Sequence, residues 1–240
     1  MNSLWAVTKG SSVRYKNHEV SPSQGSGRKL KSNGKIAKQT ASNVTLGLNG
    51  ASSAVQDNIF HEFSEQRRLL EATERFSLYL KSQRDSHYET AEPLQGEQLK
   101  MMQGHFSSAV LGKFRVRQLL NERLTNPWFY PIARKNGLNN LPELPHMAAA
   151  TFLDVIVFNE KVTPRDLFHG LVHATQIHVL GVNQFSSLFV RGFLQARSYF
   201  LVPLKAHAFS LDARFASNPD KPFSVEDEVR AWWKDGRYFT

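Results

Sequence analysis

The stretch from Thr163 to Gly181 is the clearest helix in the chain, and the rest of the sequence can be read outward from it. Thr163 suits the N-cap, Pro164 the first helical position and Asp166 the third, an arrangement that satisfies free N–H groups at the start of a helix. Gly181 follows where a left-handed residue commonly ends a helix. We therefore predict one well-capped helix over this stretch.

Two histidines, His169 and His173, lie four residues apart in this helix, so both side chains project from one face. Two imidazoles at this spacing can reach one zinc ion at about 2 Å. With nine histidines in 240 residues, such a pair arises by chance about one time in three. The alternative interpretation is that both rings lie in or beside the core and hydrogen-bond to the backbone.

The composition limits the kinds of site and compartment that the chain can have. Hydrophobic residues make up 41% of the 240 residues, enough for one sizeable core. The absence of cysteine excludes disulfides, thiolate metal sites and cysteine nucleophiles, and indicates a reducing compartment. Any metal must therefore be held by histidine and carboxylate. No segment has the ~18 uncharged residues of a membrane helix, and no signal-peptide core is present, so we expect a cytoplasmic protein without a membrane span.

Residues 1–55 differ from the rest in composition, being rich in Ser, Gly, Asn and Lys without an apolar period. We predict a disordered tail, because such a segment buries too little surface to offset its loss of entropy. Its first 50 residues carry +7 of the total charge of +9. Basic residues between 9 and 38 could bind nucleic acid or another anionic surface. A solvated tail, or extra residues from an upstream start codon, is the alternative.

The remaining chain predicts mostly helices and one strand. An apolar, β-branched run of eight residues, Thr151–Phe158, fits a strand. The run from Gly96 to Arg123 fits one or two helices, with Gly104 and Gly112 as possible breaks. The other expected elements are a helix over Asp57–Gln83, a polar connection over Asp85–Pro93, helices over Phe185–Ala196 and Pro203–Phe215, and a last helix with Ser224 as N-cap that ends before Gly236.

An apolar strand, a capped helix with HxxxH and a further helix about thirty residues on is the order found in zincin metallopeptidases. The stretch Leu167–Gln176, LFHGLVHATQ, resembles the sequence LFHELVHVVQ of a bacterial family of zincin-like, gluzincin-type proteins of uncharacterised role. The resemblance covers about residues 100–235 and continues through Leu180-Gly181, Phe189–Phe193, Val202–Phe209 and Leu211–Phe215. It implies an α+β, predominantly α-helical domain over residues 56–240, a zincin-like helix bundle with a short β-sheet.

The resemblance also implies roles for individual positions. His169 and His173 match the two metal-binding histidines of the family. Gly170 stands where the family has the glutamate that activates the zinc-bound water, and Lys205 stands where it implies the third, glutamate ligand. Glycine cannot take a proton, so a general base worth about 10²–10⁴-fold is absent. A lysine ammonium repels Zn²⁺. The two substitutions imply a degenerate HExxH motif.

Other residues near Lys205 could replace the lost ligand. Asp212 lies seven residues later, on the same helix face, and is the better candidate for a third metal ligand. It could equally form an ion pair with Lys205 or Arg214, or contact a histidine. His207 faces roughly the other way. His146, on the loop before the strand, could approach the site or be solvated.

We therefore predict a zincin-like protein without ordinary peptidase activity, which could keep a zinc site at His169 and His173 and act by binding. A peptide or protein partner could add a strand to the edge of Thr151–Phe158. One alternative is an active metal-dependent hydrolase with Asp212 as the third ligand and a base from elsewhere. Another is a nucleic-acid binder that acts through the basic tail. The sequence leaves open whether the protein is an enzyme.

Overall fold

The structure, a computed structural model, describes residues 53–196 and 198–239, with side chains over 65–196 and 198–238. Its first helix begins at Ser53, so the last three residues of the predicted tail belong to that helix. The rest of that tail, including the basic segment 9–38, lies outside the described residues.

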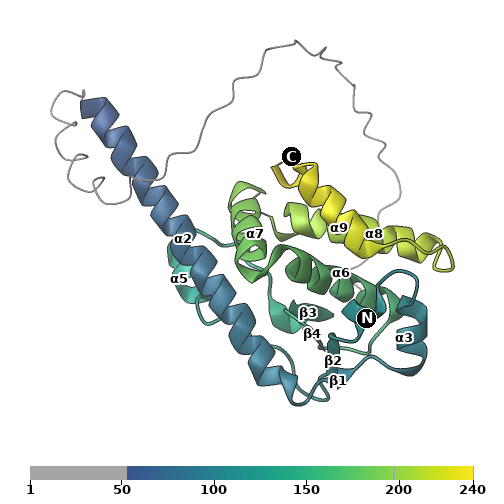
Figure 1. Cartoon of the computed structure of the whole chain (residues 1–240). Coiled ribbons are helices and arrows are strands. Elements are labelled where there is room, and N and C mark those ends of the chain that lie inside the picture. The colour runs from purple at the N-terminus through teal and green to yellow at the C-terminus, as the bar shows by residue number, and fades with distance from the viewer. Residues whose placement is uncertain (1–52, 197, 240) are drawn as a thin grey trace, which may run out of the picture. The chain divides into compact units, whose positions relative to one another are not determined.

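The described residues form an α+β fold that is predominantly helical, as the sequence predicts (Figure 1). The strands are β1 (Glu92–Pro93), β2 (Arg115–Gln118), β3 (Ala149–Phe152) and β4 (Val155–Phe158). The helices are α2 (Ser53–Tyr88), α3 (Gly96–Met102), α4 (Ser108–Leu111), α5 (Tyr130–Lys135), α6 (Pro164–Leu180), α7 (Val182–Ala196), α8 (Pro203–Ser217) and α9 (Val225–Lys234). Short 3₁₀ turns are η1 (Leu144–His146), η2 (Tyr199–Leu201) and η3 (Arg237–Phe239).

The four strands form one mixed sheet in the order β1-β2-β4-β3. β4 lies between β2, with which it is parallel, and β3, with which it is antiparallel. Its side chains alternate between two hydrophobic clusters, because successive residues of a strand point to opposite faces. Ile156 and Phe158 join the cluster under α6, whereas Val155 and Val157 join the one that contains Tyr79 of α2.

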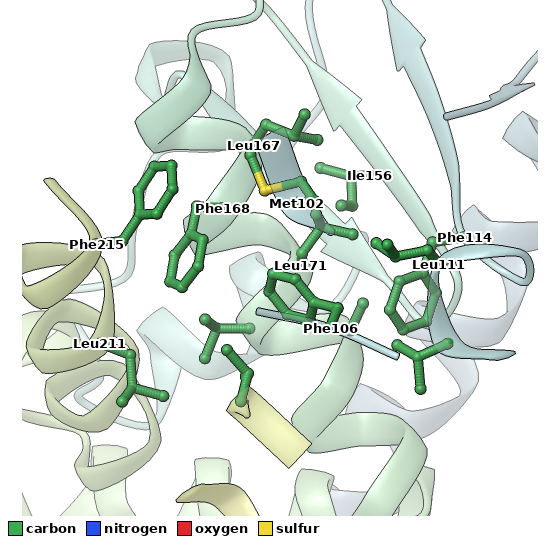
Figure 2. Packing of buried hydrophobic residues seen from close by; sticks show 14 of the residues in the cluster. Met102, Phe106, Leu111, Phe114, Ile156, Leu167, Phe168, Leu171, Leu211 and Phe215 are labelled. Atoms are coloured by element: carbon green, nitrogen blue, oxygen red, sulfur yellow. The ribbon is translucent and has the colours of Figure 1, made fainter. Parts of the chain in front are cut away.

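Helix α6 is the element on which the fold is assembled. One side of it packs on β3 and β4, and the other is covered by α8 and α9 (Figure 1). Figure 2 shows the cluster that Ile156 of β4 shares with Leu171 of α6, in which Phe168 of α6 stacks on Phe215 of α8. The predicted caps are confirmed: Thr163 Oγ1 accepts a hydrogen bond from Asp166 N at 3.1 Å, and Gly181 has a φ of 79°.

The predicted eight-residue strand is wrong, because the segment forms the hairpin β3–β4. Leu153 turns the chain with a φ of 57°, and Asp154 beside it is held by Arg84, with Nε 2.8 Å from Oδ1 and Nη2 3.0 Å from Oδ2. Asp154 is the only charged residue in this otherwise apolar run and does not by itself indicate a turn. A charged partner 70 residues away in the sequence stabilises it, and local patterns cannot reveal that contact.

The prediction of helix through Arg123 is also wrong in part. Gly104, with a φ of 91°, and Gly112 do interrupt the helices, which become α3 and α4. Residues 115–118 instead form β2, whose sequence RVRQ lacks the apolar run of a buried strand. Its partners, β1 and β4, supply the pairing that its own residues do not indicate. The predicted polar connection from Asp85 begins inside α2, which continues to Tyr88.

Gly170 lies where α6 crosses the sheet, and a side chain there would meet β4. A Cβ atom at this position would stand 2.8 Å from Ile156 Cγ2, closer than real contacts allow. We expect Gly170→Ala to lower the free energy of unfolding by about 1–3 kcal/mol through overpacking. This loss of stability is opposite in sign to the gain of about 1 kcal/mol that alanine gives over glycine in an unhindered helix. Urea unfolding measures the change.

A double-mutant cycle with Ile156→Ala isolates this contact, because that change removes Cγ2. The cost of Gly170→Ala should largely disappear in the Ile156→Ala background. Strict additivity of the two single effects would show that the close approach is not the cause.

Candidate functional site

A continuous chain of hydrogen-bonded polar side chains joins α6 to α8. Three of its members come from the face of α6 that carries the predicted histidines, and the other three come from α8. Its members, in order, are Asp212, His169, Lys205, His173, Gln176 and His207. All of them except Gln176 are residues that the sequence marks as candidate site residues, and the fold brings them together.

Lys205 lies at the centre of this polar chain. Its Nζ is 3.0 Å from His169 Nε2 and 3.2 Å from His173 Nε2. The residue is only 5% exposed. Two aromatic rings lie beside the ammonium group, with their centroids 4.8 Å (Tyr199) and 5.1 Å (Phe209) from Nζ. The lysine is thus enclosed by two imidazoles and two aromatic rings.

The outer nitrogen of each imidazole is held by another side chain. His169 Nδ1 lies 2.8 Å from Asp212 Oδ2, and His173 Nδ1 lies 2.8 Å from Gln176 Oε1. Both oxygens can only accept, so we assign the ring proton to Nδ1 in each histidine. Each Nε2 is then an acceptor that faces Lys205. This tautomer lets one ammonium group donate to both rings.

The carboxylate of Asp212 faces away from Lys205. Its Oδ1 accepts hydrogen bonds from Arg165, at 3.2 Å from Nε and 2.8 Å from Nη2, while Oδ2 serves His169. The sequence leaves open whether Asp212 is a metal ligand or instead forms an ion pair or contacts a histidine. Its contacts in the structure are those of an ion pair and of a histidine partner. The cation in the pair is Arg165, however, and not Lys205 or Arg214.

Burial sets the protonation of the cluster. It lowers the pKa of both His169 and His173 well below the usual value, and the nearby Lys205 charge lowers them further. Burial also lowers the pKa of Lys205 to about 7, against the attraction of Asp212. For Asp212, burial raises the pKa while the Arg165 hydrogen bond opposes it. Both imidazoles are therefore neutral at pH 7.

These residues, as they stand, do not fit a zinc ion. The two Nε2 atoms that would bind it already face an ammonium group, and Asp212 lies on the Nδ1 side of His169. Over residues 65–238, Arg197 excepted, no group of three or more His, Cys, Asp or Glu side chains is placed to hold a metal. We therefore derive no chemical step through a metal.

The other candidate positions lie around this cluster. Gly170 faces Ile156 of β4 rather than Lys205. His207 joins the polar chain through Gln176 Nε2, 3.2 Å from its Nδ1, and stacks on Trp232 with ring centroids 4.9 Å apart. His146 is exposed in η1 and does not belong to the cluster.

Sequence reasoning missed four members of the site: Arg165, Gln176, Tyr199 and Phe209. A signal for the first two was present, since Arg165 precedes His169 by four residues and Gln176 follows His173 by three, which places them on the same side of α6. Phe209 carries the same kind of signal, since it follows Lys205 by four residues in α8. Tyr199 carries none, because its proximity to Lys205 depends on how η2 packs on α8.

None of the family models, curated proteins or solved structures compared with this chain matches it. The zincin resemblance remains a prediction that rests on the motif residues themselves. In the described part of the chain, no helix combines the length and the apolar character that crossing a membrane requires.

Proposed function

We propose that the protein is a zincin-like scaffold that binds a peptide in extended form without cleaving it. The observation that carries the proposal is the position of the edge strand. Thr151 Oγ1 of β3 donates to Gly170 O at 3.1 Å, so β3 runs beside the turn of α6 that bears His169. A peptide paired with β3 would lie beside this turn.

The edge of the sheet offers backbone groups to such a peptide. Within the described residues, β3 pairs with β4 alone, whereas β4 is paired on both sides. From the sequence, the peptide is expected to pair with the edge of Thr151–Phe158. Only the first two residues of this stretch belong to β3 and therefore lie on an edge. Three of the four β3 residues are half-buried, which leaves them within reach of a ligand. Main-chain hydrogen bonds to an edge strand are a common mode of peptide recognition.

The groups around Lys205 support the proposed absence of cleavage. A hydrolase needs a base within reach of water, and Gly170 supplies none. Asp212 is engaged by Arg165 and His169. The two histidine Nε2 atoms accept hydrogen bonds from Lys205, so neither is free to take a proton from a water molecule.

Selection of binders from a random peptide library tests the proposal. We expect selected peptides to be recovered intact and to slow amide hydrogen exchange within residues 149–152. Peptides N-methylated at successive positions are the matched controls, since N-methylation removes one donor at a time. Methylation at alternate positions should weaken binding by about tenfold, the value of one good hydrogen bond.

Other outcomes of the same experiment would contradict the proposal. Cleaved peptides in the mass spectrum, lost on His169→Ala, would make the protein a hydrolase. Binding that is insensitive to N-methylation, or protection outside β3, would exclude strand addition.

A further inference from the structure

We propose that the ammonium group of Lys205 is a built-in cation, which fills the point on which His169 and His173 converge and keeps divalent metal ions out. The inference concerns the same region as the proposed function but does not depend on it. It holds whether or not β3 binds a peptide.

The first step is the convergence of the two imidazoles. Their Nε2 atoms lie 3.0 and 3.2 Å from one common atom, Lys205 Nζ. Asp212 and Gln176 fix each ring from its other nitrogen. Anchoring of this kind is what orients histidines around a metal ion. The rings are thus arranged to hold a cation, and the cation present is a lysine side chain.

The second step is that the side chains around the ammonium group are placed to offset part of the cost of burying it. It donates to two neutral acceptors, and the faces of Tyr199 and Phe209 lie within the range in which aromatic rings attract a cation. Burial works against the charge and lowers the pKa of Lys205 to about 7, and the attraction of the Asp212 carboxylate, one ring away, opposes this lowering. The lysine therefore joins α8 to α6 as a bridging ion would.

The third step is exclusion of metals. A divalent ion could reach the two Nε2 atoms only by displacing the ammonium group. The displaced charge would have to move into the space held by Tyr199 and Phe209 or lose its proton. The ion would also meet like charge from Arg165 and, among the residues that the structure describes, find no third ligand on its side of the rings.

The test compares zinc and cobalt binding by the full-length wild type, Lys205→Met and Lys205→Glu. Isothermal titration at pH 6.5, where Lys205 is mostly charged and both histidines are neutral, gives the affinity, and the visible absorption of Co²⁺ reports tetrahedral nitrogen and oxygen ligands. We expect no His169-dependent binding in the wild type. Lys205→Met frees two imidazoles and should bind zinc about tenfold more tightly than the wild type, whose residual binding does not depend on His169. Lys205→Glu adds a carboxylate on a shorter side chain, which leaves room for the ion, and should bind at least about 100-fold more tightly than the wild type.

His169→Ala, made in each background, is the control for zinc bound elsewhere on the surface. It should leave the wild type unchanged and abolish the gain in Lys205→Glu. If Lys205→Glu unfolds without metal, zinc should raise its melting temperature, because an ion that binds only the folded state stabilises it. A wild type that binds one zinc and loses it on His169→Ala would overturn the inference. A folded Lys205→Glu without added affinity would do so as well.

Discussion

Asn159→Ala is expected to lower the free energy of unfolding by about 3–5 kcal/mol, because one buried side chain satisfies three backbone groups. Asn159 Oδ1 accepts from Leu124 N at 2.7 Å. Its Nδ2 donates to Leu144 O at 2.7 Å and to Met147 O at 2.8 Å. Alanine would leave all three groups without these partners at the end of β4, which lies at the centre of the sheet.

Urea unfolding followed by circular dichroism measures this loss, with Asn136→Ala as the matched control. Asn136 is exposed and donates to Ile132 O at 3.0 Å, so its replacement should cost no more than about 0.5 kcal/mol. Equal effects of the two substitutions would show that Asn159 does not hold the loops around β4.

The free energy of unfolding is expected to rise by about 3 kcal/mol between pH 7 and 9.5 because of Lys205. Burial lowers the folded-state pKa of this lysine from 10.5 to about 7. Between these values the unfolded chain binds more protons than the folded one, so stability increases with pH. Below pH 7 both states are protonated, and the cost of burying the ammonium group is fully present.

Lys205→Met should remove this rise, since methionine fills similar space without titrating. Urea unfolding at closely spaced pH values from 6.5 to 9.5 measures it. The upper limit avoids buried tyrosines such as Tyr79, whose pKa burial raises above the usual 10.0, so that their ionisation would destabilise the fold. His169 and His173, with lowered pKa values, should cost stability only as the pH falls below 6.5. The same slope in wild type and Lys205→Met would assign the rise to other groups.

Local signals in the sequence were sufficient to predict the helices α6 to α9. Thr163 and Ser224 act as N-caps, and Gly181 ends α6, because capping depends on a few neighbouring residues. The site was also partly predictable. The spacing of His169 and His173, and of Lys205 and Asp212, places each pair on one helix face, and packing of α6 on α8 brings the pairs together.

The remaining features depend on contacts between distant segments. The parallel pairing of β2 with β4, and the turn that Arg84 holds at Asp154, leave little trace in the local pattern. The sequence indicates that a lysine opposes zinc, but only the structure places Nζ between the two Nε2 atoms. It likewise shows Asp212 on the opposite side of His169, where Arg165 holds it.

The pairing of β2 with β4 has a consequence for how the chain can be divided. The two strands run side by side in register from Arg115 and Val155, yet the connection between them contains α5, η1 and β3. A fragment that ends within residues 119–154 would contain β2 without the strand with which it pairs in parallel, and the complementary fragment would contain β4 with one edge unpaired. We therefore expect residues 92–158 to fold as one unit. Cleavage of the chain within this interval, or separate expression of its two parts, should yield two fragments that aggregate alone and fold only when combined.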